Sequence, residues 1–298
     1  MSSQPKNLTP ESAAVPYGYT DEELATLPLV YADGLLEGKT CILSGGGSGI
    51  GKATAFVLAR LGASVMICGR REERLQQTVS SIKSLIGRDI HYQAMTIRDP
   101  QQVETLFDNA WDTLGGVDFI VNNGGGQFPQ DAIDFSDKGW NAVIDTNLNG
   151  TWYMMQRAAR RWRDAERPGH IINVVAVVNR GMPQVAHTCA ARAGVIYLSK
   201  TVATEWAPFN IQVNCVAPGS IATEGLGVYE PEVAAMFKYA NAMHRLGDVA
   251  DIAQAIVYLA APSGKFITGE VLTVDGGAQQ HGENWSAGIP DYFKIRGR

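Results

Sequence analysis

The chain has 298 residues, 45% of them hydrophobic, and 25 Lys and Arg against 30 Asp and Glu give a net charge of −5. This hydrophobic content supports a sizeable core and excludes a disordered or fibrous chain. The mildly acidic balance lacks the basic surface that nucleic-acid binding needs. The sequence contains no run of 18 apolar residues that could span a bilayer. We therefore expect neither nucleic acid nor a membrane as a partner.

The N-terminal segment is polar and proline-rich, without the apolar stretch of a secretory signal, so a cytoplasmic location is expected. The predicted organisation is a polar extension over residues 1–36, a single nucleotide-binding domain over 37–277 and a tail over 278–298. The 4 cysteines are widely separated, which favours small buried side chains in a reducing compartment. The 5 histidines show no metal-ligand spacing, so no metal site is expected.

Short apolar runs alternate with longer amphipathic stretches through most of the chain. The runs predict seven strands, over residues 41–44, 64–68, 90–95, 119–122, 171–175, 211–215 and 271–274. Helices are predicted between them, over stretches such as 52–61, 73–86, 100–114 and 249–260. Apolar strands separated by helices are typical of an α/β fold, here a Rossmann-type doubly wound seven-stranded parallel sheet in a single domain.

A glycine run, Ser44–Gly51, follows the first predicted strand and opens the first helix. In that place Gly45 permits a tight turn, Gly49 lets backbone approach a pyrophosphate, and Gly51 allows the helix to close on the strand. The helix N-terminus then offers free N–H groups and the positive end of its dipole to phosphates. The sequence therefore predicts a dinucleotide site.

The end of the second strand indicates which dinucleotide binds. An NAD site would place Asp or Glu here to bind the ribose 2′-hydroxyl, but the chain reads Cys68-Gly69-Arg70-Arg71. Two guanidinium groups can bind a phosphate through paired hydrogen bonds, so NADP(H) is favoured. A solvated helix start is the other interpretation of Arg70 and Arg71.

Five motifs in order, Gly45–Gly51, Asn122–Gly125, Asn147, Pro218–Ile221 and Asp275–Gly277, make the chain resemble the short-chain dehydrogenase/reductase family. The resemblance implies a role for each position. The pyrophosphate would be held by Gly45, Gly47, Ser48, Gly49, Ile50 and Gly51, and the 2′-phosphate by Arg70 and Arg71. Thr96 and Ile97 would border the adenine, Asn123, Gly124 and Gly125 would line the adenosine side, and Pro218, Gly219, Ile221 and Thr223 would contact the nicotinamide.

The catalytic positions depart from the family, most of whose members carry Asn, Ser, Tyr and Lys, the last two as Tyr-x-x-x-Lys. Asn147 is retained, but the other three positions fall on Ala176, Thr188 and Arg192. A threonine hydroxyl is far less acidic than a phenol, and a guanidinium stays charged and cannot relay a proton. Arg192 could still hold the nicotinamide ribose. Tyr197 lies on the opposite face of the predicted helix from Thr188, as a core or interface aromatic.

Such a site suits a reaction in which charge develops on an oxygen that needs only hydrogen bonds. Conjugate reduction of an α,β-unsaturated thioester sends hydride to the β-carbon and collects charge on the thioester oxygen. Asn147, Thr188 and Gln127 are the candidate donors to that enolate oxygen. His187 is a candidate proton source because an imidazole titrates near operating pH, although a hydrogen-bonded structural role is equally compatible.

Further motifs make the chain look like the peroxisomal trans-2-enoyl-CoA reductases and, more broadly, the 2,4-dienoyl-CoA reductase branch. These are Val121–Phe128, Lys138–Trp140, Ala190–Val195 and Asn284-Trp285. The dienoyl branch uses a Tyr at the position that Val177 occupies here. The prediction is an NADPH-dependent reductase of trans-2-enoyl thioesters, assembled as a homodimer or homotetramer as the family implies. A carbonyl or alcohol oxidoreductase with an atypical acid, and a non-catalytic NADP-binding protein, remain as alternatives.

Overall fold

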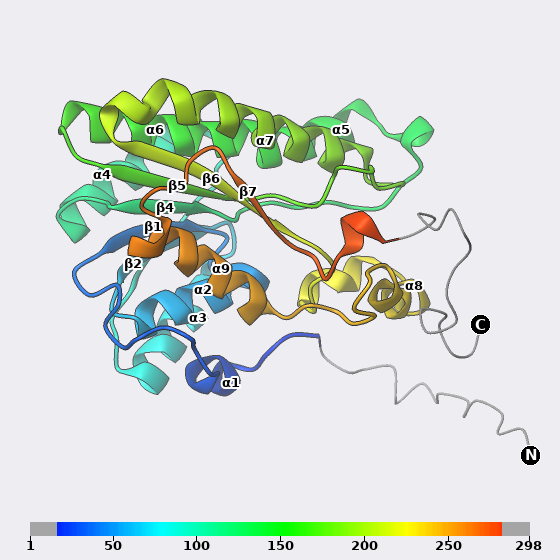
Figure 1. Cartoon of the computed structure of the whole chain (residues 1–298), viewed down its shortest axis with the longest axis horizontal. Coiled ribbons are helices and arrows are strands. Elements are labelled where there is room, and N and C mark those ends of the chain that lie inside the picture. The colour runs from blue at the N-terminus through cyan, green and yellow to red at the C-terminus, as the bar shows by residue number, and fades with distance from the viewer. Residues whose placement is uncertain (1–16, 282–298) are drawn as a thin grey trace, which may run out of the picture.

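The structure is a computed structural model, which describes residues 17–281. Its centre is a seven-stranded sheet in the order β3-β2-β1-β4-β5-β6-β7, with every pair of neighbours parallel (Figure 1). The strands are β1 (Thr40–Ser44), β2 (Ser64–Gly69), β3 (His91–Ala94), β4 (Phe119–Asn122), β5 (Gly169–Val174), β6 (Ile211–Pro218) and β7 (Val271–Val274). The predicted doubly wound parallel sheet is confirmed.

Helices cover both faces of the sheet (Figure 1). One face carries α2 (Gly49–Arg60), α3 (Glu72–Ile86) and α9 (Val249–Ala260), and the other carries α4 (Pro100–Leu114), α5 (Asp137–Ile144), α6 (Gly150–Asp164) and α7 (Ala186–Trp206). The short α8 (Pro231–Met236) lies beyond the carboxyl ends of the strands. Because both faces are covered, the strands are buried on both sides, and all four residues of β4 are inaccessible to solvent.

Local signals in the sequence explain where the helices begin and end. The Asp99 side chain accepts from the first backbone N–H groups of α4, Pro100 occupies the first turn, and Gly115 ends the helix with φ 71°. Asp248 and Asp251 form a reciprocal capping box at the start of α9. Predicted and observed boundaries coincide for β4, β7, α4 and α9 and differ by at most three residues elsewhere, as at α2, which begins at Gly49 inside the glycine turn itself.

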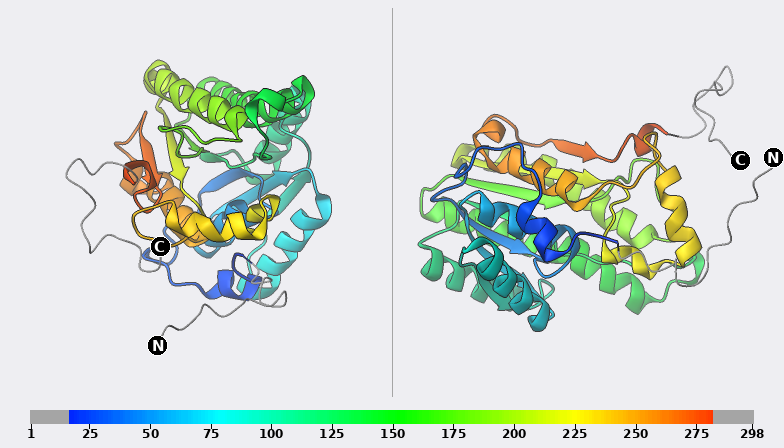
Figure 2. Two further views of the ribbon diagram at one scale, coloured as in Figure 1. Left: turned by 90° about the vertical axis from the view of Figure 1, so that its right-hand side faces the viewer. Right: turned by 90° about the horizontal axis from the view of Figure 1, so that it is seen from below.

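The predicted N-terminal extension includes a segment that packs on the domain. Helix α1 (Asp21–Thr26) lies against α2 and α3, as the view from below shows (Figure 2). Leu24, Leu27 and Leu36 are buried in the same apolar cluster as α2 and α9, and Asp21 forms an ion pair with Lys52. Residues 17–36 thus contribute to the core despite their polar composition. The boundary at residue 36 stays a prediction, and residues 1–16 and most of the tail, including Trp285, lie outside the described residues.

Burial shifts the pKa of several polar side chains in the core. Cys41, Cys68 and Cys215 are buried, as predicted, and burial raises the pKa of Cys68 to about 12. His170 on β5 is 7% exposed, and its Nε2 lies 3.0 Å from Nδ2 of Asn214. That amide also donates to the Ile267 carbonyl, so the imidazole nitrogen accepts from it as a neutral ring. Burial lowers the pKa of His170 to about 4, because the protonated ring would be desolvated.

We expect this histidine to make the folded state sensitive to acid. In the unfolded chain His170 binds a proton near pH 6.5, whereas in the folded chain its pKa is about 4. The free energy of unfolding therefore falls as the pH falls through this window. The loss is about 3 kcal/mol. Urea unfolding of His170→Gln across the same range should show a shallower dependence on pH. The exposed His91 on β3 gives the matched control, His91→Gln, which should follow the wild type; an equally steep fall in His170→Gln would assign the effect to other groups.

Candidate active site

The carboxyl ends of the parallel strands form one edge, and the predicted site residues lie at the strand ends, in the loops that leave this edge and in the helices that follow those loops. The strand order reverses between β1 and β4, since the chain runs outward to β3 from one and to β7 from the other. At such a switch point the two loops diverge and leave a crevice in which ligands of open α/β sheets bind. Residues 45–51 follow β1 and residues 123–128 follow β4, so both groups border this crevice.

The glycine turn has the geometry that its spacing predicts. Gly45 and Gly49 have φ of 74° and 50°, in the left-handed region that favours glycine. A Cβ on Gly51 would lie 2.1 Å from the Gly45 carbonyl oxygen, so the first turn of α2 closes directly on the turn before it. The Asn123 amide donates to the carbonyls of Ser44 and Gly45 and ties the β4 loop to this turn. Ile50 continues the first turn of α2.

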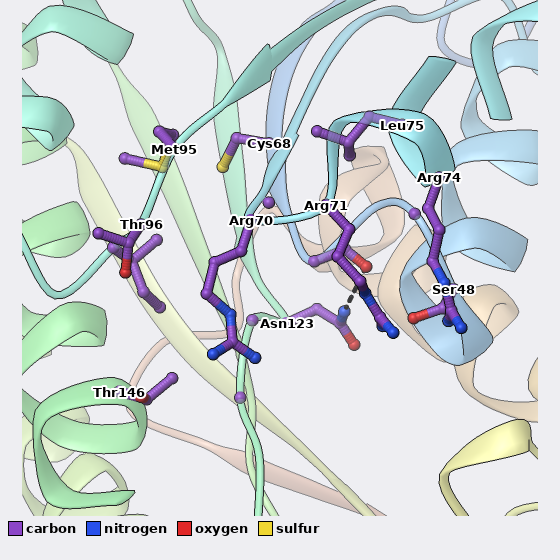
Figure 3. Close-up of a pocket in the computed structure, with 16 residues that line it drawn as sticks. Ser48, Cys68, Arg70, Arg71, Arg74, Leu75, Met95, Thr96, Asn123 and Thr146 are labelled. Atoms are coloured by element: carbon purple, nitrogen blue, oxygen red, sulfur yellow. Dashed lines mark hydrogen bonds between the residues drawn. The ribbon is translucent and has the colours of Figure 1, made fainter. Parts of the chain in front are cut away.

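Three arginines reach from the end of β2 and the start of α3 into one pocket (Figure 3). Arg70 and Arg71 were predicted there, whereas Arg74 was not. The Cβ of Arg74 lies 3.1 Å from where a Cβ on Gly47 would stand, so its side chain rises directly over the glycine turn. Arg74 lies in the first turn of α3, which begins at Glu72 after the N-cap Arg71, and no motif in the sequence pointed to it. The pocket is therefore strongly positive beside Ser48, the N-cap of α2.

The same pocket brings together ten of the predicted cofactor residues. They are Gly45, Gly47, Ser48, Arg70, Arg71, Thr96, Ile97, Asn123, Gly124 and Gly125. Cys68 and Met95 add apolar side chains to the wall on the side of Thr96, and Leu75 adds one on the side of Arg74 (Figure 3). An apolar wall next to a positive rim suits a flat base joined to a phosphorylated ribose.

The chain after β6 reaches the other end of the glycine turn. From Pro218 the strand leads into Gly219, whose N–H donates to the Val274 carbonyl at 2.9 Å. A Cβ on Gly219 would lie 2.7 Å from Cα of Asp275, so only glycine fits against β7. Ile221 bridges to Gly247, and Thr223 comes within 3.5 Å of the Cβ position of Gly49. Of the residues predicted for the nicotinamide side, Thr223 thus lies beside the glycine turn, and Gly219 and Ile221 lie against Asp275 and Gly247.

The Asn147 side chain holds the loop after β4 through two hydrogen bonds to its backbone. It lies in a π-helical turn, Asp145–Asn149, that joins α5 to α6, and its side chain is 1% exposed. Its Oδ1 accepts from the Gly126 N–H at 3.0 Å and its Nδ2 donates to the Gly126 carbonyl at 2.9 Å. Thr151 holds the Asn147 carbonyl from the next turn. Single π-turns of this kind occur frequently at functional sites.

Arg192, which replaces the usual Lys, is a buried cation at the same place. It is 8% exposed, and its Nη1 is buried without a hydrogen-bond partner among residues 17–281. A Cβ on Gly125 would lie 2.2 Å from Arg192 Nη2 and 3.0 Å from Asn147 Oδ1, so these two side chains meet under the β4 loop. Burial lowers the pKa of Arg192 to about 10, which leaves it charged at neutral pH. An unpaired buried guanidinium is costly, which indicates that a ligand supplies its partner.

His187 and Thr188 begin α7, but their surroundings differ. The His187 ring is inaccessible, stacked on Phe135 with centroids 4.4 Å apart and edge-on to Phe128 at 4.7 Å. Its Nδ1 accepts from the Thr188 N–H at 2.7 Å, and burial lowers its pKa. This enclosure favours a neutral structural imidazole over the predicted proton source. Phe128 and Phe135 lie more than fifty residues before His187 in the sequence, so the sequence alone did not reveal this aromatic enclosure.

Gln127 makes a contact that no motif predicted. Its Nε2 donates to the phenol oxygen of Tyr229 at 2.7 Å, across 102 residues of sequence. Tyr229 follows a short 3₁₀ segment, Glu224–Val228, that starts next to Thr223.

Tyr197 on α7 is 72% exposed, so it does not belong to the core. It lies away from Thr188, which is 3% exposed.

No group of three or more His, Cys, Asp or Glu side chains within residues 17–281 is placed to hold a metal ion. In the same part of the chain, every helix is too short or too polar to cross a membrane.

The fit of Gly51 against Gly45 predicts a specific failure. Gly51→Ala should push α2 off the turn, lower the free energy of unfolding by about 1–3 kcal/mol and weaken dinucleotide binding at least about tenfold. Thermal unfolding and fluorescence titration with NADPH measure the two effects. Gly227→Ala is the matched control, because a Cβ there meets no atom of the described chain within 4 Å. Wild-type affinity in Gly51→Ala would contradict this account of the turn.

Comparisons with known proteins agree with this geometry. The family model described as enoyl-(acyl carrier protein) reductase matches residues 45–279. A Bacillus subtilis (strain 168) protein named "Probable 2,4-dienoyl-CoA reductase" is 36% identical over 248 residues, 81% of this chain and 97% of its own. A 3-oxoacyl-(acyl-carrier-protein) reductase of Thermotoga maritima is 35% identical and covers 81% and 98% of the two chains.

Solved structures give the same result. The citronellol catabolism dehydrogenase of Pseudomonas aeruginosa PAO1 superimposes with a TM-score of 0.76 and is 35% identical, covering 84% of this chain and 99% of its own. The family-model match covers the glycine turn, the strands from β2 to β7 and the loops that carry the site. The chain belongs to the short-chain dehydrogenase/reductase family of oxidoreductases.

Proposed function

We propose that the protein is an NADPH-dependent reductase of α,β-unsaturated acyl thioesters, of the trans-2-enoyl type. The observation that supports this most directly is the replacement of the usual Ser, Tyr and Lys by Ala176, Thr188 and Arg192 around a retained, buried Asn147. The relatives named as dienoyl-CoA and oxoacyl carrier-protein reductases act on acyl thioesters, which supports the substrate class.

The phosphorylated cofactor is proposed from the charge of its pocket. Arg70, Arg71 and Arg74 line the same wall, and Ser48 lies at the rim between them and α2. A guanidinium binds a phosphate through paired, charge-assisted hydrogen bonds. The pocket lining includes no Asp or Glu that would bind a ribose 2′-hydroxyl and repel a phosphate. NADPH is therefore favoured over NADH.

The glycine cradle and the unpartnered Arg192 Nη1 fit a nicotinamide dinucleotide, which supplies a hydride to the substrate when bound. Arg192 keeps the site positive and is placed to hold the nicotinamide ribose. Asn147 fixes the Gly126 backbone and so orients Gln127. Gln127 and the Thr188 hydroxyl are then the donors toward the thioester oxygen, where negative charge collects as hydride reaches the β-carbon.

We also propose a homodimer or homotetramer. Tyr197 on α7 is 72% exposed, with Lys200 above its ring, and Trp152 and Trp206 stack across α6 and α7. Large aromatic side chains on adjoining helices suit a contact with a second copy. The cytoplasmic location stays a prediction.

Cofactor preference should follow the arginines. NADPH should bind at least about tenfold more tightly than NADH, since an added phosphate gains charge-assisted contacts of about 1.5–3 kcal/mol each. Fluorescence titration measures both dissociation constants. Arg74→Gln should weaken NADPH and leave NADH unchanged, whereas Arg88→Gln, which removes the exposed partner of Glu37, should alter neither. Equal wild-type constants for the two cofactors would contradict the proposal.

The reaction is tested by following NADPH oxidation at 340 nm with trans-2-enoyl-CoA chains of several lengths. Asn147→Ala should lower kcat by about 100-fold or more, because the Gly126 backbone and Gln127 lose their support. Asn149→Ala is the control, as Asn149 lies in the same π-turn but donates to Asp145.

The same assay separates the alternatives. Parallel reactions with 2,4-dienoyl-CoA, 3-oxoacyl-CoA and simple ketones identify the other chemistries that the relatives' names suggest. Turnover of ketones and no enoyl thioester would support the carbonyl oxidoreductase instead. NADPH binding with no turnover of any substrate would support a non-catalytic protein.

A further inference from the structure

The conjugate reduction proposed above needs a proton, and the positions that supply it in the family hold Thr188 and Arg192. A threonine hydroxyl is a weak acid, and the enclosed His187 is held neutral by its aromatic neighbours. A different acidic group at the site would fill this need. The one phenol that hydrogen-bonds a candidate catalytic side chain, among residues 17–281, is Tyr229.

The hydrogen bond between Gln127 and Tyr229 leaves the phenol ready to donate. The Gln127 Nε2 donates to the Tyr229 oxygen at 2.7 Å, so the phenol accepts in this contact. Its own O–H is directed to no acceptor among residues 17–281. A half-buried phenol with an unused proton, beside an amide predicted to contact the substrate oxygen, is poised to give that proton to a bound molecule.

The loop that carries Tyr229 is fixed at both sides of the site. Thr223 and Glu224 lie about 3.5 Å from the Cβ position of Gly49, at the pyrophosphate turn. The Tyr229 ring packs edge-on against Phe237, with centroids 4.8 Å apart and planes at 85°. The phenol is thereby held between the cofactor turn and Gln127, which Asn147 positions through Gly126.

We propose that Tyr229 is the proton donor of the reaction, a catalytic residue in place of the missing tyrosine. The inference rests on the proposed function. As a hydride from the reduced nicotinamide forms the C–H bond at the β-carbon, the C=C π bond breaks and its electron pair moves to the thioester as an enolate. The Tyr229 O–H bond then breaks, its proton bonds to the α-carbon, and the phenolate takes a proton from solvent water.

The electrostatics of this phenol suit a donor. Burial raises the pKa of Tyr229, and the hydrogen bond from Gln127 opposes that rise. The first effect keeps the phenol protonated at neutral pH, and the second stabilises the phenolate at the moment the proton leaves.

The test compares Tyr229→Phe with Tyr239→Phe in the full-length protein. Tyr229→Phe keeps the ring packing on Phe237 and removes the hydroxyl alone. It should lower kcat for enoyl-CoA reduction by about 100-fold or more, while the NADPH dissociation constant and the melting temperature stay at wild-type values. Tyr239→Phe, in which the ring beside His244 is kept, should retain wild-type kcat.

A second measurement separates proton donation from a structural role of the hydroxyl. Placing 3,5-difluorotyrosine at position 229 lowers the pKa of the phenol without removing it. Because the donor must be protonated, the alkaline limb of the kcat/KM profile should move to lower pH. A hydroxyl that only latches the loop would not move this limb.

The outcomes distinguish the two proposals. If the wild type reduces enoyl thioesters and Tyr229→Phe stays within about threefold of it, Tyr229 is not the donor and the proposed function stands. An alkaline limb that stays fixed with the fluorinated residue also overturns the donor role. If the wild type reduces no thioester, the proposed function is overturned. The donor role of Tyr229 is then overturned as well, because no enolate forms to accept its proton.

Discussion

The two hydrogen bonds between the Asn147 amide and the Gly126 backbone are the contact on which the site depends. They hold the loop after β4 at a fixed height over the π-turn between α5 and α6. The residue before Gly126 lies against Arg192, and the residue after it bonds Tyr229. One buried side chain thus sets the distance between the cation, the loop and the opposing phenol. A buried amide that is satisfied at both ends has no cheap alternative conformation, which makes it a firm support.

The sheet and the glycine turn could be predicted from sequence because their signals are local. Apolar runs buried on both faces and the spacing of Gly45, Gly49 and Gly51 depend on neighbours a few residues apart. Leu24, Leu27 and Leu36 were hidden in a polar segment, since their spacing gives no periodic pattern. Helix α1, which holds Leu24, has 6 residues, so its contacts with α2 and α3 stabilise it in addition to its own capping box.

The candidate catalytic group is less visible in the sequence because tertiary contacts define it. Gln127 and Tyr229 are 102 residues apart, and only the fold brings the loops after β4 and β6 to the same crevice. The same limit applies to His187. The ordinary pKa of an imidazole, near operating pH, suggested acid–base chemistry for this residue. In the structure two phenylalanines from a distant loop exclude water from the ring, and burial lowers its pKa. Motif reasoning identifies residues that act through the backbone or through helical spacing, and misses those that act through their surroundings.

Arg192 stands at the position where most of the family has a lysine, and this replacement agrees with a proton donor that is not on α7. A lysine beside a tyrosine lowers the phenol's pKa and takes part in returning its proton, whereas a guanidinium can only hold charge in place. Arg192 is buried with an unpaired nitrogen, so its contribution is a fixed positive field under the ligand. A fixed field stabilises an enolate as it forms but cannot deliver hydrogen to carbon. The proposed division of the two tasks gives the charge to Arg192 on α7, whose Nη1 is buried under the β4 loop, and the proton to Tyr229 on the loop after β6, whose hydroxyl Gln127 bonds.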